Sequence, residues 1–77
     1  MLRVEYMTRA ELLDAFQSGL TGDARRSYRV EIIWEYLWQK LGEDEYPRLQ
    51  SAWAVYEDGG GREELDLVCD QIRRGWA

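Results

Sequence analysis

The stretch Tyr28–Leu41, YRVEIIWEYLWQKL, decides the fold, because its apolar residues form two stripes at helical spacing. The first stripe is expected to face a core and consists of Val30, Ile33, Trp34, Leu37 and Leu41, with Trp38 at its edge. The second lies on nearly the opposite side and consists of Tyr28, Ile32 and Tyr36. A helix that is apolar on two sides needs two surfaces to pack against.

The residues before this helix predict another one. Thr8 and Glu11 have the spacing of a capping box, which favours a helix from about Arg9 to Ser18. Gly19 is well placed to end that helix in a left-handed conformation. Its inward face is expected to contain Leu12, Leu13 and Phe16, with Leu20 packed under the turn. The organising helix then opens at about Ala24, after a cap from Thr21 or Asp23.

Two more helices are expected after Gly42. Pro47 suits a first helical turn, and the spacing of the apolar residues that follow predicts a helix from about Asp44 or Pro47 to Tyr56. A competing interpretation makes residues 52–57 a strand that enters a Glu-Asp-Gly-Gly-Gly hairpin turn. The helix is favoured, because the residues after the glycines also have helical spacing and predict a fourth helix from about Arg62 to Arg74. The inward faces are expected to contain Tyr46, Leu49, Ala52, Trp53 and Tyr56 in one helix and Leu65, Val68, Cys69, Ile72 and Trp76 in the other.

The amino-terminal residues alternate between apolar and polar side chains at Leu2, Val4 and Tyr6, which predicts a short strand or an extended arm. One strand alone is not stable. The segment must therefore lie across the helices, pair with a second copy in a homodimer, or be a helical lead-in. A homodimer would bury both the arm and the second stripe; the alternative is that the arm covers this stripe within one monomer.

These patterns together predict an all-α fold, a compact bundle or array of about four short helices in a single domain of 77 residues. With no His and one Cys, neither a disulfide within the chain nor a metal site is expected, and no cofactor motif is present. Cys69 is expected to be a buried small hydrophobe. No run approaches the apolar length of a membrane span, and no signal-peptide pattern is seen, so a cytoplasmic protein is expected.

The charge is uneven along the chain, whose net charge is −5. Residues 31–70 contain eleven acids against Lys40, Arg48 and Arg62, a balance of −8. An acidic chain is repelled by nucleic acid and by anionic membranes, so its expected partner is a basic protein surface. An ordinary solvated face is the alternative.

Function is therefore expected to lie in stoichiometric binding and not in catalysis. Small acidic chains are common among phage-encoded inhibitors of nucleic-acid-handling machines, including anti-CRISPR proteins and DNA mimics, and this chain is similar to them in size and charge alone. A structural or self-assembling subunit is the second hypothesis, and a small enzyme that uses carboxylates is the third. The expected steering residues are Glu43, Asp44, Glu45, Glu57, Asp58, Glu63, Asp66 and Asp70, and the expected apolar anchor is Tyr28, Ile32 and Tyr36.

Overall fold

The computed structural model describes residues 4–20 and 28–76, and for Tyr28 the backbone alone. Within these ranges the chain contains helices and no strand, so the predicted all-α fold with four α-helices is confirmed. The elements in chain order are the 3-10 helix η1 (Val4–Tyr6), α1 (Arg9–Gly19), α2 (Tyr28–Leu37), the 3-10 helix η2 (Trp38–Lys40), α3 (Glu45–Glu57) and α4 (Glu63–Trp76).

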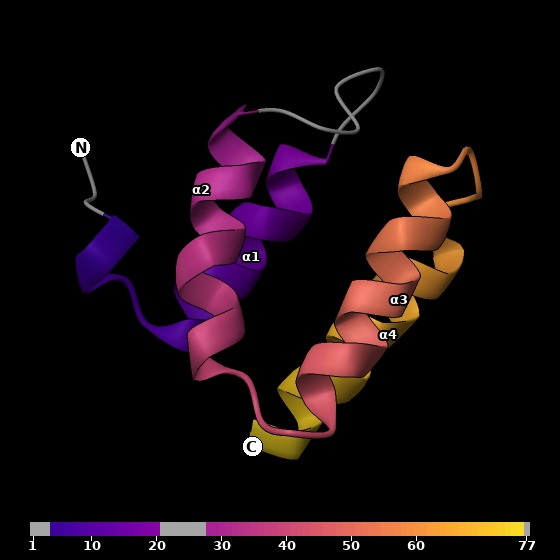
Figure 1. Cartoon of the computed structure of the whole chain (residues 1–77). Coiled ribbons are helices and arrows are strands. Elements are labelled where there is room, and N and C mark those ends of the chain that lie inside the picture. Colours follow the sequence, from indigo (N-terminus) through magenta and orange to yellow (C-terminus); the bar gives the residue numbers. More distant parts are fainter. Residues whose placement is uncertain (1–3, 21–27, 77) are drawn as a thin grey trace. The chain divides into compact units, whose positions relative to one another are not determined.

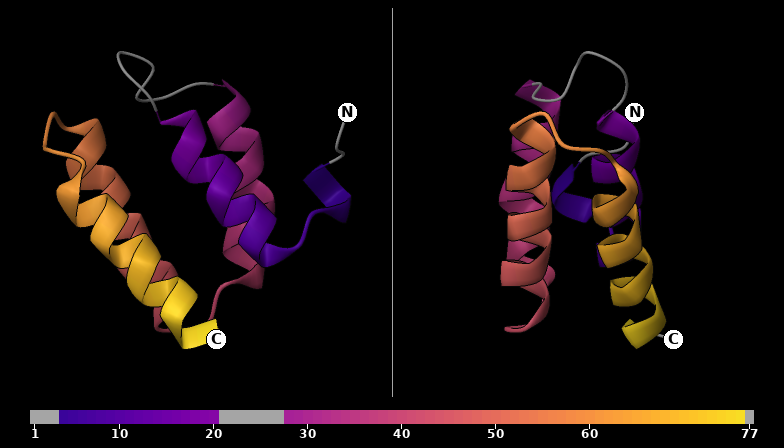
Figure 2. Two further views of the ribbon diagram at one scale, coloured as in Figure 1. Left: turned by 180° about the vertical axis from the view of Figure 1, so that it is seen from behind. Right: turned by 90° about the vertical axis from the view of Figure 1, so that its right-hand side faces the viewer.

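The chain divides into two compact units, which are described separately. The amino-terminal unit, Met1–Leu41, contains the antiparallel pair α1 and α2 with η1 beside α2 (Figures 1 and 2). The carboxy-terminal unit, Gly42–Ala77, contains the antiparallel pair α3 and α4 (Figures 1 and 2). Each unit is thus a helical hairpin, and the predicted single domain stays a prediction.

The start of α1 is the capping box that the sequence predicts. Glu11 N–H donates to the Thr8 hydroxyl over 3.2 Å, and Thr8 N–H donates to the Glu11 carboxylate over 2.9 Å. Two amides that a helix start leaves without an intrahelical partner are satisfied in this way. The expected core faces are confirmed by the buried side chains of Leu12, Leu13, Phe16 and Leu20 in one segment and Val30, Ile33 and Leu37 in the next. At the end of the second of these core faces the prediction is wrong, because Leu41 is only half-buried and Trp38 is exposed.

The predicted left-handed ending of α1 at Gly19 is wrong, since the one described glycine with positive φ is Gly59. A Cβ built on Gly19 would lie 2.7 Å from Cγ2 of Val30 in α2. The glycine is therefore needed for the close approach of the two helices and not for a backbone conformation.

The organising helix ends earlier than predicted, because α2 ends at Leu37 and the chain continues as η2 up to Lys40. Its predicted start at about Ala24 and the predicted cap from Thr21 or Asp23 lie outside the described residues. The side-chain amide of Gln39 donates to the Glu35 carbonyl over 2.6 Å, and a continued α-helix would offer that carbonyl to the backbone N–H of Gln39. Leu41 then adopts an extended conformation, with φ −86° and ψ 149°.

Trp34 is only half-buried, although the sequence places it in the core stripe. Its ring lies against Phe16 of α1, with 5.4 Å between the centroids and 40° between the planes. Trp34 thus covers one edge of the α1–α2 contact, since its ring is too large for complete burial in so thin a layer.

The amino-terminal strand is also wrong for the described part of that segment, because Val4–Tyr6 is a 3-10 helix. Residues 1–3 lie outside the described residues. A 3-10 turn satisfies its backbone groups locally, as the Met7 N–H to Val4 carbonyl bond of 3.2 Å shows, whereas a strand needs a partner that the described chain does not offer. The helical lead-in is the alternative that the structure supports.

In the carboxy-terminal unit, α3 extends from Glu45 to Glu57, so the hairpin interpretation of residues 52–57 is wrong. It ends in a Schellman motif, in which Gly59 has φ 99° and Gly60 N–H donates to the Val55 carbonyl over 3.0 Å. The Arg48 side chain donates to the Gln71 side chain, which links α3 to α4. The predicted inward faces are confirmed by the buried side chains of Leu49, Ala52, Trp53 and Tyr56 in α3 and Leu65, Val68, Cys69 and Ile72 in α4, whereas Tyr46 and Trp76 are half-buried.

Candidate functional site

The two units differ sharply in charge. The amino-terminal unit contains six acidic and six basic residues, whereas the carboxy-terminal unit contains nine acidic residues and four arginines. The whole net charge of −5 is therefore carried by the carboxy-terminal unit. All eight predicted steering acids belong to this unit, and all three predicted anchor residues belong to the other one.

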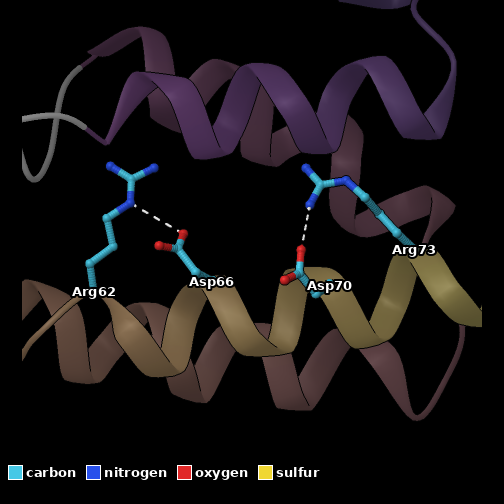
Figure 3. Close-up of polar contacts among 4 residues, drawn as sticks. All are labelled: Arg62, Asp66, Asp70 and Arg73. Carbon is cyan, nitrogen blue, oxygen red and sulfur yellow. Dashed lines mark hydrogen bonds and ion pairs between the residues drawn. The ribbon is translucent and has the colours of Figure 1, made fainter.

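Two acids on α4 are paired with arginines, of which Arg62 immediately precedes the helix and Arg73 lies in its last turn (Figure 3). Arg62 Nε lies 3.2 Å from Asp66 Oδ1, and Arg73 Nη1 lies 3.5 Å from Asp70 Oδ1. Pairs of this exposure contribute only about 0 to 1 kcal/mol to stability, but each arginine cancels most of the field of its carboxylate. Asp66 and Asp70 are consequently weaker steering residues than the sequence suggests.

Glu45 has a structural role at the start of α3. Its Oε1 accepts from Gly42 N–H over 2.8 Å and from the Trp76 indole N–H over 3.4 Å. The first bond repeats the spacing of the Thr8–Glu11 pair, and the second joins the first turn of α3 to the end of α4. This cap is difficult to recognise from the sequence, because Gly42 occupies the position where a capping box has Ser or Thr. The three acids that follow it resemble an acidic linker.

Five acids of the carboxy-terminal unit are exposed and lie at the ends of its helices. Glu43 and Asp44 precede α3, Asp58 follows it, and Glu63 and Glu64 lie in the first turn of α4. Because α3 and α4 are antiparallel, Asp58, Glu63 and Glu64 share one end of the hairpin, which we call the acidic end (Figure 1). Carboxylates are also favoured in the first turn of a helix by its dipole. Glu57 is half-buried beside this end.

The acidic end has an apolar neighbour that sequence reasoning missed. The side chain of Leu67 in α4 is 55% exposed. It follows Glu63 by four residues and Glu64 by three, the spacings that place side chains together on a helix surface. Glu64 was missed as well. Helical periodicity over residues 62–74 could have identified both residues, because it places Leu67 outside the inward stripe and Glu64 one turn before Leu67.

Two of the three residues of the predicted apolar anchor line a hollow of the amino-terminal unit. Ile32 and Tyr36 are half-buried and line this hollow together with residues of η1 and α1. The side chain of Tyr28 lies outside the described residues. The structure therefore supports the alternative in which the amino-terminal segment lies against the second stripe within one chain.

The thiol of Cys69 is buried, as expected. Burial raises its pKa to about 11, and Arg73 opposes that increase only in part. At neutral pH the thiol is therefore protonated and a poor nucleophile.

Among the residues that the structure describes, no group of three or more Cys, Asp or Glu side chains could hold a metal ion. Over the same residues, no helix has the length and apolar character needed to cross a membrane. Comparisons with protein-family models, curated proteins and solved structures find no match to this chain.

Proposed function

We propose that the protein acts by stoichiometric binding to a basic protein surface, and that the acidic end of the carboxy-terminal unit makes the contact. The observation that carries this proposal is the concentration of the net charge of −5 in one helical hairpin. Three of its exposed acids lie together at one end, beside the exposed side chain of Leu67. Charge would guide the encounter, and burial of Leu67 would add affinity.

The class of partner follows from the charge. Proteins that bind nucleic acids present lysines and arginines to the phosphate backbone, and these side chains attract an acidic surface equally well. An inhibitor of a nucleic-acid-handling machine, of the kind represented by anti-CRISPR proteins and DNA mimics, would work by occupying such a surface. The proposal needs no catalytic step.

The test is an affinity capture from cell lysate at low and at high salt, followed by mass spectrometry. A near-stoichiometric basic protein should be recovered at low salt and lost as the salt concentration rises, because exposed charges are screened beyond about 10 Å at 0.1 M ionic strength. The variant Glu63→Gln/Glu64→Gln should recover much less of that protein than the wild type.

The matched control is Asp66→Asn/Asp70→Asn, which removes the same charge from the same helix. It should recover nearly as much partner as the wild type, because these two carboxylates are already paired with arginines. Equal losses for the two variants would contradict the assignment of the acidic end. Recovery of the protein itself and nothing else would favour a self-assembling structural subunit.

A further inference from the structure

The exposed face of α4, which is the helix in front of α3 in the left view of Figure 2, has an apolar side chain between charged ends. Leu67 is 55% exposed and lies on the opposite side of the helix from the buried residues Leu65 and Ile72. Helical spacing places Glu63 one turn before Leu67 and Arg74 two turns after it, on the same face. We call this face the outer face, and its residues are Glu63, Glu64, Leu67, Gln71 and Arg74, all of them exposed.

The two ends of the outer face carry opposite charges that cannot pair with each other within one helix. Glu63 and Glu64 lie in the first turn of α4, and Arg74 lies in the last turn. Arg74 follows Glu64 by ten residues, which is about 15 Å along a helix and too far for an ion pair. The ion pairs of Asp66 and Asp70, in contrast, join residues three or four positions apart. The charges at the ends of the outer face are therefore placed to meet another molecule.

This arrangement makes the outer face complementary to a second copy of itself. When two identical helices pack antiparallel about a two-fold axis, the first turn of each lies against the last turn of the other. In the register that places Glu64 of each copy opposite Arg74 of the other, Leu67 lies opposite Gln71, because both pairs are centred on residue 69. The two leucines are then only four residues, about 6 Å, apart along the helix axis and close enough to touch. The antiparallel helix dipoles add a favourable term.

We infer that the outer face of α4 binds the outer face of a second copy, in an antiparallel dimer with Glu64–Arg74 ion pairs on both sides of the leucines. This surface is distinct from the second stripe of α2, which belongs to the other unit. One helix from each copy offers less contact area than the roughly 1,200 to 2,000 Å² of a stable interface, so the dimer is weak. The net charge of −5 opposes association at long range, but salt at about 0.1 M screens charges beyond about 10 Å, and the close ion pairs then decide.

The dimer and the complex with a basic partner use the same carboxylates. Glu63 and Glu64 belong to both the outer face and the acidic end, so dimer formation covers the acidic end and competes with the partner. The inference does not rest on the proposed function, because self-association is measured on the protein alone. Arg74→Glu separates the two, since it removes the cation of the dimer and leaves the acidic end unchanged. This variant should stay monomeric and still recover the basic partner from lysate.

Sedimentation velocity of the full chain at about 0.5 mM, in about 0.1 M salt, measures a dimer of this weakness. The wild type should contain a dimer fraction that increases with protein concentration. Glu63→Lys/Glu64→Lys and Arg74→Glu should each be monomeric, because like charges then face each other across the two-fold axis. An equimolar mixture of these two variants should form a heterodimer, since opposite charges face each other again.

Two further variants locate the contact. Glu43→Lys/Asp44→Lys makes the same change of charge at two exposed acids that precede α3, and it should leave the dimer intact. Leu67→Asp should abolish the dimer, because a carboxylate then replaces the apolar centre of the outer face. Circular dichroism checks that each variant retains its helices.

Three outcomes would overturn the inference. These are a monomeric wild type at this concentration, a mixture of the two charge-reversed variants that stays monomeric, and a dimer that Glu43→Lys/Asp44→Lys abolishes as completely as Glu63→Lys/Glu64→Lys does. None of them bears on the capture of a basic partner. A dimer that behaves as expected, together with a capture that recovers no partner, would contradict the proposed function alone.

Discussion

At the scale of single residues, the contact between Gly19 and Val30 is the tightest test of the amino-terminal unit. A Cβ at Gly19 would lie 2.7 Å from a methyl group that is buried and stiff, so neither side can yield without moving a helix. Gly19→Ala should therefore lower the free energy of unfolding by about 1 to 3 kcal/mol, as overpacking does. Urea denaturation measures this change.

The matched control is Gly75→Ala near the end of α4. The nearest atom to a Cβ there is 3.9 Å away, which is an ordinary contact. Alanine is the better helix former by about 1 kcal/mol, so this variant should be slightly stabilised. If both variants were stabilised, the close approach of α1 and α2 would be wrong.

The capping box makes a prediction about pH. The hydrogen bonds from Thr8 lower the pKa of Glu11 below its ordinary value of 4.5, the backbone bond being the larger cause. A carboxyl whose pKa is lower in the folded state stabilises the protein above its unfolded pKa, and this contribution is lost as pH falls through the folded pKa. The stability difference between wild type and Glu11→Gln should therefore be larger at pH 7 than at pH 3.

Thr8→Ala provides a check of the same cap that does not depend on titration. Loss of an N-cap hydroxyl costs about 0.5 to 2 kcal/mol. Urea denaturation of both variants at the two pH values gives the full comparison. A difference for Glu11→Gln that stayed constant between pH 7 and pH 3 would show that the hydrogen bonds do not favour the ionised carboxyl.

The sequence was sufficient for features that depend on neighbours along the chain. The Thr8–Glu11 cap and the inward face of α4 follow from spacings of three and four residues. The role of Gly19 in helix packing could not be predicted from local spacing, because Val30, the residue that contacts it, belongs to another helix. The bond from the Trp76 indole to Glu45 was missed because the two residues are 31 positions apart in the sequence.

At the scale of elements, two leucines show the difference between a buried and an exposed helix face. Leu37 in α2 is completely buried, whereas Leu67 in α4 is 55% exposed. Leu37→Ala should cost about 2 to 5 kcal/mol, and Leu67→Ala should change stability by no more than about 0.5 kcal/mol. Thermal and urea unfolding measure both. A large loss for Leu67→Ala would mean that this side chain belongs to the core and is not available to a partner.

The element that sequence reasoning assigned wrongly is η1. Alternation over five residues predicts a strand, but strand formation also requires a pairing partner, which periodicity does not reveal. The segment is instead placed by a bond from Lys40 to the Met7 carbonyl, 33 residues apart in sequence. The opposite error was avoided in α3, where the spacing of Leu49, Trp53 and Tyr56 correctly favoured a helix.

At the scale of the whole molecule, composition predicted the sign of the charge but not which acids remain exposed and unscreened. From the sequence, the same steering role was predicted for eight acids. In the structure, Asp66 and Asp70 are paired with arginines and Glu45 caps a helix, so the exposed charge at the acidic end falls to Asp58, Glu63 and Glu64. Which of these acids can meet a partner depends on such contacts, and composition does not reveal them.

The most direct test of the proposed function is the association rate between the protein and its captured partner, measured over a range of salt concentrations. Exposed charges act mainly on association, so Glu63→Gln/Glu64→Gln should lower the rate several-fold at low salt and flatten its salt dependence. Asp66→Asn/Asp70→Asn should follow the wild type closely. Identical rates and salt slopes for all three proteins would contradict binding through the acidic end.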